Sequence, residues 1–361
     1  MPRLVALSGF DAKGPACFLL ELGGARLMLD LGTGPDAGRL PDLAGVGPVD
    51  AILLSHGHAD HAGALQLAPL VGSPPVHASP PVFVLSGPPP GPVGVALPRR
   101  GRVEIVGVEV ETGAAGHAPG AVWMRIGGAG GLLYTGDCAT GPSVWPFEMP
   151  PPAEAVVLDA SYGVADTALA VQQAELLGLL SSAPVLLPSP ADGRGLDIAC
   201  AALAAGVGVA LCPAHRRVAE TLLARPDWLA DGAAGTLRDL LAKASPLDVD
   251  SPARGAMIAV SADAASGLSA PLAARFAVTG EARILFTGYL GAGTPAAALV
   301  CEGHAGHMRW NVHPRLSDTR ALLAATKPRV AMPAFCPPHL RAALAAALPG
   351  APFCTGPEMT W

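Results

Sequence analysis

The chain has 361 residues, of which 51% are hydrophobic and 14% charged, and its formal net charge is −6. This composition predicts a globular protein with a sizeable core, and it excludes a protein that attracts nucleic acid through a general positive surface. The 7 cysteines show no C-x-x-C spacing and no apolar run is long enough to span a bilayer. We therefore expect a cytoplasmic protein with reduced thiols and no membrane contact.

The first part of the chain is predicted to consist of short strands and tight turns. Two apolar runs around Gly23 indicate a hairpin over 17–32, and the buried strand expected at 51–55 precedes a helix over 61–70. Further strands are predicted at 101–113, 121–126, 131–137 and 156–159. Only one helix is expected in this part.

After Gly163 the pattern changes to strands that alternate with helices. Helices are predicted at 168–183, 195–206 and 216–224, and strands at 184–188, 207–212, 255–263 and 283–288. Such alternation is typical of a parallel sheet with helical crossovers. Two helices and a strand follow near the end of the chain, at 319–326, 339–348 and 329–333. The sequence therefore predicts an α/β domain that is split by an inserted α/β domain.

One short stretch, SHGHADH, gathers His56, His58, Asp60 and His61 at the end of the strand 51–55. Histidines two residues apart in extended chain project to the same side, so His56 and His58 can face one point. Asp60 and His61 begin the next helix and face a neighbouring point. The pattern predicts two metal ions, and these ligands suit zinc, with manganese or iron as alternatives. A polar loop with coincidental histidines is the competing interpretation.

This stretch resembles the H-x-H-x-D-H signature of the metallo-β-lactamase superfamily. Three further residues match the motif series of that family: Asp30 in LMLDLG, His117 in AGHAPGA and Asp137 in LLYTGDC. The resemblance implies an αβ/βα sandwich with a dinuclear site at one edge of its sheets. It assigns His117 to the first ion, Asp137 to both ions as a bridge and Asp30 to a supporting role. For His117 and Asp137 the alternative is an ordinary turn residue.

Four later motifs resemble those of the β-CASP nuclease subgroup, to which ribonuclease J and the polyadenylation-complex cleavage subunit belong. They are VVLDASYG at 156–163, VLLPSPADGRG at 185–195, ILFTGYLGAGT at 284–294 and RWNVHPRLSD at 309–318. The resemblance implies a compact, bacterial-type member of the subgroup. Its metallo-β-lactamase domain would comprise 1–166 and 301–361, with a shortened β-CASP-like domain inserted at 167–300.

Within these motifs the resemblance gives roles to three residues. His313 would contact the scissile phosphate as a catalytic residue, Arg194 would bind a substrate phosphate, and Asp159 would hydrogen-bond a metal-ligating histidine. The competing interpretations are a surface histidine, a solvated loop arginine and a helix-capping aspartate, respectively. Asp60 is expected to serve catalysis as well as metal binding.

The last motif of the subgroup is changed in this chain. It usually supplies another histidine to the second ion, but the matching stretch, RVAMPAFCPPH, has Pro333 or Ala334 at that place. His339, a few residues later, is the nearest substitute. With the usual ligand missing, the second ion is expected to bind more weakly than the first.

The sequence thus predicts a metal-dependent hydrolase, most specifically a phosphodiesterase or exonuclease that cleaves single-stranded nucleic acid, RNA above all, through a metal-bridging hydroxide. Two alternatives stay open. A hydrolase of a small ester, lactone or thioester is favoured by the acidic net charge and by the presence of only three lysines, Lys13, Lys243 and Lys327. A non-catalytic, nuclease-like scaffold is the third hypothesis, and the oligomeric state stays open.

Overall fold

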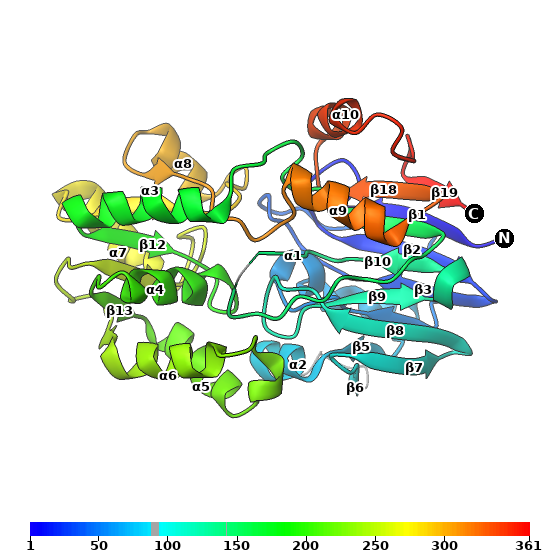
Figure 1. The fold of residues 1–361 in the computed structure, drawn as a ribbon, viewed down its shortest axis with the longest axis horizontal. Coiled ribbons are helices and arrows are strands. Elements are labelled where there is room, and N and C mark those ends of the chain that lie inside the picture. Colours follow the sequence, from blue (N-terminus) through cyan, green and yellow to red (C-terminus); the bar gives the residue numbers. More distant parts are fainter. Residues whose placement is uncertain (88–93, 142) are drawn as a thin grey trace. The chain divides into compact units, whose positions relative to one another are not determined.

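The computed structural model describes residues 1–87, 94–141 and 143–361, which cluster into two compact units (Figure 1). The first unit contains Met1–Gly141, Phe147–Asp166 and Val312–Trp361, and Thr167–Asn311 with the segment 143–146 forms the second. Residues 301–311, grouped with the end of the chain on sequence grounds, cluster here with the second unit. Among the described residues, no helix has both the length and the apolar character that a membrane span requires.

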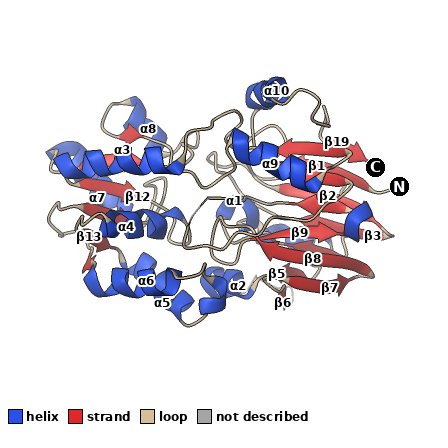
Figure 2. Ribbon diagram, viewed as in Figure 1, coloured by secondary structure: helices blue, strands red, loops and turns tan. Residues whose placement is uncertain are grey.

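Two β-sheets form the body of the first unit (Figure 2). The seven-stranded sheet has the order β19-β1-β2-β3-β4-β5-β6 and is built from β1 (Arg3–Ser8), β2 (Cys17–Leu22), β3 (Ala25–Leu29), β4 (Ala51–Leu53), β5 (Val76–Ala78), β6 (Gly94–Ala96) and β19 (Glu358–Thr360). The six-stranded sheet has the order β18-β11-β10-β9-β8-β7 and is built from β7 (Gly101–Ile105), β8 (Val108–Ala114), β9 (Val122–Ile126), β10 (Leu132–Tyr134), β11 (Ala155–Asp159) and β18 (Val330–Ala334). The helical segments are α1 (Ala59–Ala62), η1 (Leu65–Val71), α2 (Pro80–Ser86), η2 (Gly128–Gly130), α9 (Leu316–Thr326) and α10 (Pro338–Ala347).

The inner faces of these two sheets share one core, and helices cover the outer faces. Phe18 of β2 packs edge to face on Tyr134 of β10, with ring centroids 5.6 Å apart. On the opposite face of β2, Leu19 packs in a cluster with Val71 of η1, and the outer face of the second sheet packs against Leu322 of α9. This layer order is the αβ/βα sandwich that the sequence predicts, and the fold prediction is confirmed.

Two predicted elements of the first unit are wrong in detail. The helix expected over 61–70 is the short helix α1, capped at Gly63, followed by the 3-10 helix η1, which contains Pro69. Proline lacks the amide hydrogen that a continuous α-helix requires. The single strand expected over 101–113 is a hairpin of β7 and β8, whose turn residues Val106 and Gly107 have φ values of 50° and 75°. The apolar alternation runs through this turn and conceals it.

The second unit is a six-stranded parallel sheet with helical crossovers, as the sequence predicts. Its strand order is β14-β13-β15-β12-β16-β17, with β12 (Val185–Pro188), β13 (Val209–Leu211), β14 (Ser245–Pro246), β15 (Ala256–Ala259), β16 (Arg283–Phe286) and β17 (Gly306–His307). Its helical segments are α3 (Leu169–Ser182), α4 (Arg194–Ala204), α5 (Pro213–Leu223), η3 (Pro226–Trp228), α6 (Ala233–Lys243), α7 (Ser269–Thr279) and α8 (Pro295–Cys301). Leu272 and Phe276 of α7 pack on Leu186 and Phe286 of the sheet.

Three backbone segments of the first unit are joined tightly beside the histidine-rich stretch. The amide of Ala16 donates to the carbonyl of Asp60 over 2.8 Å, and the amide of Leu31 donates to the carbonyl of His61 over 2.8 Å. Gly32 lies so close that a Cβ atom there would overlap the carbonyl oxygen of Asp60. The loop before β2 and the loop after β3 therefore fix the position of α1.

This close approach gives a first testable expectation. Gly32→Ala should lower the free energy of unfolding by about 1–3 kcal/mol, since overpacking forces the backbone to shift, and it should weaken metal binding because α1 must move. Gly130→Ala is the matched control, since a Cβ atom there meets nothing within 4 Å. Denaturant unfolding measures both variants. Equal stability of Gly32→Ala and the control would contradict the packing described here.

Candidate metal centre

The histidines singled out in the sequence come together in the first unit, in loops that follow strand ends. His56 and His58 follow β4, His61 lies in α1 and His117 follows β8. The remaining members are Asp137 after β10, Asp159 at the end of β11 and His313, which follows the return of the chain to this unit. The motif residues are thus neighbours in space although they span most of the sequence.

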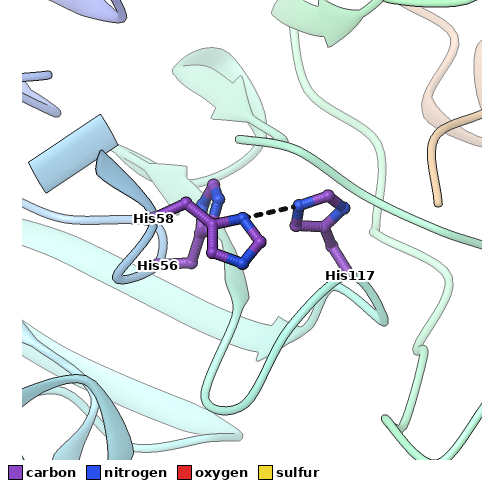
Figure 3. Close-up of side chains that lie close together, drawn as sticks. All are labelled: His56, His58 and His117. Atoms are coloured by element: carbon purple, nitrogen blue, oxygen red, sulfur yellow. Dashed lines mark hydrogen bonds between the residues drawn. The ribbon is translucent and has the colours of Figure 1, made fainter. Parts of the chain in front are cut away.

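His56, His58 and His117 form a triangle of imidazole rings (Figure 3). The ring centroids of His56 and His58 are 4.7 Å apart, those of His56 and His117 are 5.0 Å apart, and those of His58 and His117 are 4.9 Å apart. The Nδ1 atom of His58 lies 3.0 Å from the Nε2 atom of His117. One nitrogen from each ring lies within 4.8 Å of the others, so the three residues could hold one metal ion.

Asp137 takes part in two further groups of potential ligands. It groups with His56 and His61 on one side and with His117 and His313 on the other. Its Oδ1 atom is 3.3 Å from His61 Nε2, and its Oδ2 atom is 3.6 Å from His117 Nε2. The carboxylate is 2% exposed. Its contacts with histidines on two sides place it between the two groups of potential ligands.

Neighbouring oxygens fix the orientation of three imidazoles in the same way. The Nδ1–H group of His117 donates to the carbonyl of Val312 over 2.6 Å, and that of His61 donates to Asp30 over 2.7 Å. His313 Nδ1–H donates to Asp159 over 2.8 Å. In the neutral form of each ring, the lone pair is then on Nε2. This arrangement is common around protein metal sites, where a hydrogen bond to one nitrogen sets the tautomer and the direction of the other.

Three buried polar atoms of the cluster have no hydrogen-bond partner among the described residues: His56 Nε2, His61 Nε2 and Asp137 Oδ1. A buried polar atom without a partner costs about 1–3 kcal/mol. Two imidazole nitrogens and one carboxylate oxygen without partners are of the donor types that a divalent transition-metal ion takes. The residues present therefore fit a metal such as zinc.

The charges of the cluster agree with this fit. Burial holds the pKa of His56 and His117 well below the ordinary histidine value, so both are neutral ligands. For His61, burial lowers the pKa, but the carboxylates of Asp137 and Asp30 outweigh it and raise the pKa to about 10. Burial would raise the pKa of Asp137, yet the charges of Lys13 and the neighbouring histidines hold it well below its usual range. The centre therefore combines two neutral imidazoles with an ionised carboxylate, which is a combination that can bind a cation.

Asp30 accepts hydrogen bonds from several residues around this centre. The buried carboxylate accepts hydrogen bonds from the amide and hydroxyl of Ser55, at 2.7 and 2.8 Å, and from Nδ1 of His61. The hydroxyl of Tyr134 donates to it over 2.6 Å. The hydroxyl of Ser55, which donates to Asp30, also lies 3.1 Å from Nδ1 of His56. Asp30 thus connects two of the histidines to both sheets, which agrees with the supporting role expected for it.

Asp30→Ala should lower the free energy of unfolding by several kcal/mol. The reason is that Ser55, His61 and Tyr134 each lose an acceptor, and each unsatisfied buried group costs about 1–3 kcal/mol. Metal affinity should fall with it, because the Ser55 hydroxyl, which contacts both Asp30 and Nδ1 of His56, loses its fixed position. Urea unfolding checks the first effect and zinc titration the second. Asp239→Ala removes an exposed pair with Lys243 and should change stability by less than about 0.5 kcal/mol; an equally small effect at Asp30 would refute its role.

Lys13 is the member of the site that sequence reasoning missed. Its side chain is 8% exposed, and Nζ lies 2.8 Å from Asp137 Oδ2 and 3.5 Å from Asp60 Oδ2. Burial lowers the pKa of Lys13, but the charges of Asp137 and Asp60 overcome this effect and raise it above the ordinary value. The available sequence signal is the rarity of lysine in this chain, which by itself indicates only a low positive charge.

The place of the missing histidine is taken by apolar groups. In β18, Pro333 and Ala334 lie in register with Leu158 and Asp159 of β11. The next residue, Phe335, packs its ring 5.1 Å from the ring of His61, between centroids. His339 is exposed at the start of α10 and belongs to none of the ligand clusters found among the described residues.

The predicted substrate contact Arg194 lies in the second unit, at the first residue of α4. Its Nε–H donates to the hydroxyl of Thr287 over 3.0 Å. A Cβ atom on Gly288 would overlap the guanidinium group, so the arginine packs directly on this glycine. The G-R segment and the T-G-Y segment of the sequence motifs therefore contact each other within the second unit.

Asp159 contacts His313, and its contacts through Oδ1 are to a local turn at 161–164 and not to the start of a helix. Its Oδ2 atom accepts from His313, and from the amide of Cys138 over 3.1 Å. Its Oδ1 atom accepts from the amide and hydroxyl of Ser161 in a local turn. His313 is 9% exposed in its side chain and 3.7 Å from Asp137 Oδ2, so it lies beside the cluster of possible ligands.

Comparison with known proteins agrees with the fold. Residues 11–161 match the model of the family described as Metallo-beta-lactamase superfamily. The chain is 44% identical over 88 residues to "Cleavage and polyadenylation specificity factor subunit 2" from Oryza sativa subsp. japonica, a match that covers 23% of this chain and only 12% of that protein. A crystal structure of a protein of unknown function from Enterococcus faecalis V583 has the same fold, with a TM-score of 0.59 and 14% identity over 100% of both chains. The matched residues thus form a metallo-β-lactamase superfamily domain.

Proposed function

We propose that the protein is a metal-dependent hydrolase that cleaves phosphodiester bonds in single-stranded nucleic acid, with RNA as the preferred substrate. The observation that carries the proposal is the convergence of His56, His58 and His117 beside the buried Asp137. These three imidazoles would hold the ion, and zinc is the metal we assign to them. We also propose that the chain is a member of the β-CASP nuclease subgroup.

The residues of the centre divide the chemical work between them. A divalent cation held there supplies positive charge for a phosphate and lowers the pKa of a water molecule. His56, His58 and His117 would bind this ion, and Asp137 would add negative charge beside it. His313 is held by Asp159 through Nδ1–H, and in its imidazolium form it would give the proton on Nε2 to the leaving oxygen. Asp159 acts as a positioning residue, since it fixes the direction of that ring.

The choice of nucleic acid as substrate is supported by the sequence motifs and by the partial relative, which is named a cleavage and polyadenylation specificity factor subunit. In the second unit, two of these motifs meet where Arg194 packs on Gly288. We assign Arg194 a contact with a substrate phosphate, because guanidinium groups suit phosphate geometry.

A second function is favoured by the charge of the chain. The net charge of −6 and the presence of only three lysines give little general attraction for a polyanion. A small ester, lactone or thioester needs no such attraction. We therefore keep hydrolysis of a small neutral substrate as the alternative.

One experiment separates these functions. The zinc-loaded protein is incubated with 5′-labelled single-stranded RNA and DNA of equal sequence, and in parallel with a panel of chromogenic esters, with and without a chelator. The proposal expects cleavage of the RNA that the chelator abolishes. Turnover of esters without cleavage of either oligonucleotide would overturn it in favour of the alternative. Bound zinc with no turnover of any substrate would instead indicate a scaffold.

A further inference from the structure

The loop between β1 and β2 places a buried ammonium group inside the metal centre. Lys13 is 8% exposed, and its neighbour Gly14 is so tightly packed that a Cβ atom there would meet the carbonyl oxygen of Gly34 at 2.6 Å. Ala16 completes the attachment, since its amide donates to the carbonyl of Asp60. The position of the ammonium is therefore set by backbone packing and does not depend on a flexible side chain alone.

The ammonium lies between two carboxylates. Nζ is 2.8 Å from Oδ2 of Asp137 and 3.5 Å from Oδ2 of Asp60, and the ring of Phe335 adds a cation–π contact at 5.4 Å from its centroid. A buried charge is costly unless it is paired and hydrogen-bonded. These partners compensate it, so the ammonium is a fixed positive charge of the folded protein.

The same two carboxylates are the ones that a second metal ion would need. Together with His61 they are the ligands that the sequence motif assigns to that ion, and both direct Oδ2 at Lys13. A further ligand would have to come from the side of β18, where the aromatic ring of Phe335 packs against His61 instead. A divalent cation at this point would meet an ammonium ion on one side and an apolar ring on another.

We propose that the Lys13 ammonium takes the place of the second cation, so that the centre binds one divalent ion per chain. His56, His58 and His117 hold that ion, whereas Asp60 is a partner of Lys13 and not a metal ligand. Asp137 lies between the two positive charges, 3.6 Å from His117 Nε2 and 2.8 Å from Lys13 Nζ. The inference rests on the metal centre of the proposed function and changes its count of ions from two to one.

Metal stoichiometry tests this inference without any assay of activity. The wild-type protein, Lys13→Met and Lys13→Ala are dialysed against a zinc excess, freed of unbound zinc and measured by plasma mass spectrometry. Circular dichroism confirms that each variant is folded. Lys243→Met is the matched control. The Lys243 side chain is 61% exposed, and it pairs with the exposed Asp239 on the same helix of the second unit.

We expect one zinc ion per chain for the wild type and the control, and a second equivalent in the Lys13 variants, whose freed carboxylates become available to metal. Two ions in the wild type would overturn the inference while leaving the proposed function intact. A single ion in folded Lys13 variants would also overturn it. No zinc in the wild type would overturn the proposed metal centre and the inference with it. If neither variant folds, the wild-type count alone decides between one ion and two.

Discussion

His58→Ala should yield a folded protein that has lost both its metal ion and its hydrolytic activity. His58 is partly exposed in a loop, so its removal leaves the core of the sandwich intact. We expect zinc affinity to fall by more than about 100-fold, because changes to residues that merely support a metal ligand already cost about 10–100-fold. Turnover should fall by about 1,000-fold or more, since the ion supplies several kcal/mol of charge stabilisation.

Zinc titration by calorimetry and a cleavage assay measure these two losses in the same preparation. His339→Ala is the control, because this histidine is exposed at the start of α10 and outside the clusters found among the described residues. It should match the wild type in both measurements. If His58→Ala kept full zinc affinity, the triangle of imidazoles would not be the metal site.

His313→Ala should separate metal binding from chemistry. The hydrogen bond to Asp159 orients the ring beside Asp137, but the three imidazoles of the first cluster form without it. We therefore expect the variant to retain its zinc and to lose about 100- to 10,000-fold in turnover, the usual contribution of general acid–base catalysis.

The comparison for this variant is His304→Ala, which removes an exposed histidine of the second unit and should leave both properties unchanged. Zinc content and single-turnover rate are measured on each protein. Because His313 also forms a group of possible ligands with His117 and Asp137, loss of zinc would show that it binds the metal. That result would contradict the proton-donor role assigned here.

The histidines of the loop after β4 could be predicted from sequence because their signal is local. His56 and His58 alternate along extended chain at a strand end, and the periodicity of a strand alone puts them on one side. His117 and Asp137 have no such local signal, and only the resemblance to a family connected them to the site. The structure places both beside the histidine pair, so the sequence did indicate which residues come together.

The position of Lys13 could not be predicted in this way. It depends on backbone hydrogen bonds between three segments that are distant in sequence, and on a glycine at position 32 that allows them to approach. The support of His117 by the carbonyl of Val312 is of the same kind, since any residue carries a carbonyl group. Backbone hydrogen bonds such as these cannot be predicted from residue types, because nearly every residue carries the same amide and carbonyl groups.

The fold followed from the sequence to a larger extent than the supporting contacts did. Buried strands such as β4, β11 and β12 are short apolar runs that the sequence shows directly. The alternation of predicted strands and helices indicates the parallel sheet of the second unit. The errors arose where one residue interrupts a regular pattern, as Pro69 does in the expected helix and Val106 with Gly107 in the expected strand. Local backbone chemistry outweighed periodicity at these points.

Anomalous diffraction at the zinc absorption edge, from crystals of the zinc-loaded wild-type protein, tests the central claim most directly. The account predicts one strong peak among the imidazole nitrogens of His56, His58 and His117, beside the carboxylate of Asp137. An anomalous peak at any other place, or none in a protein saturated with zinc, would contradict it.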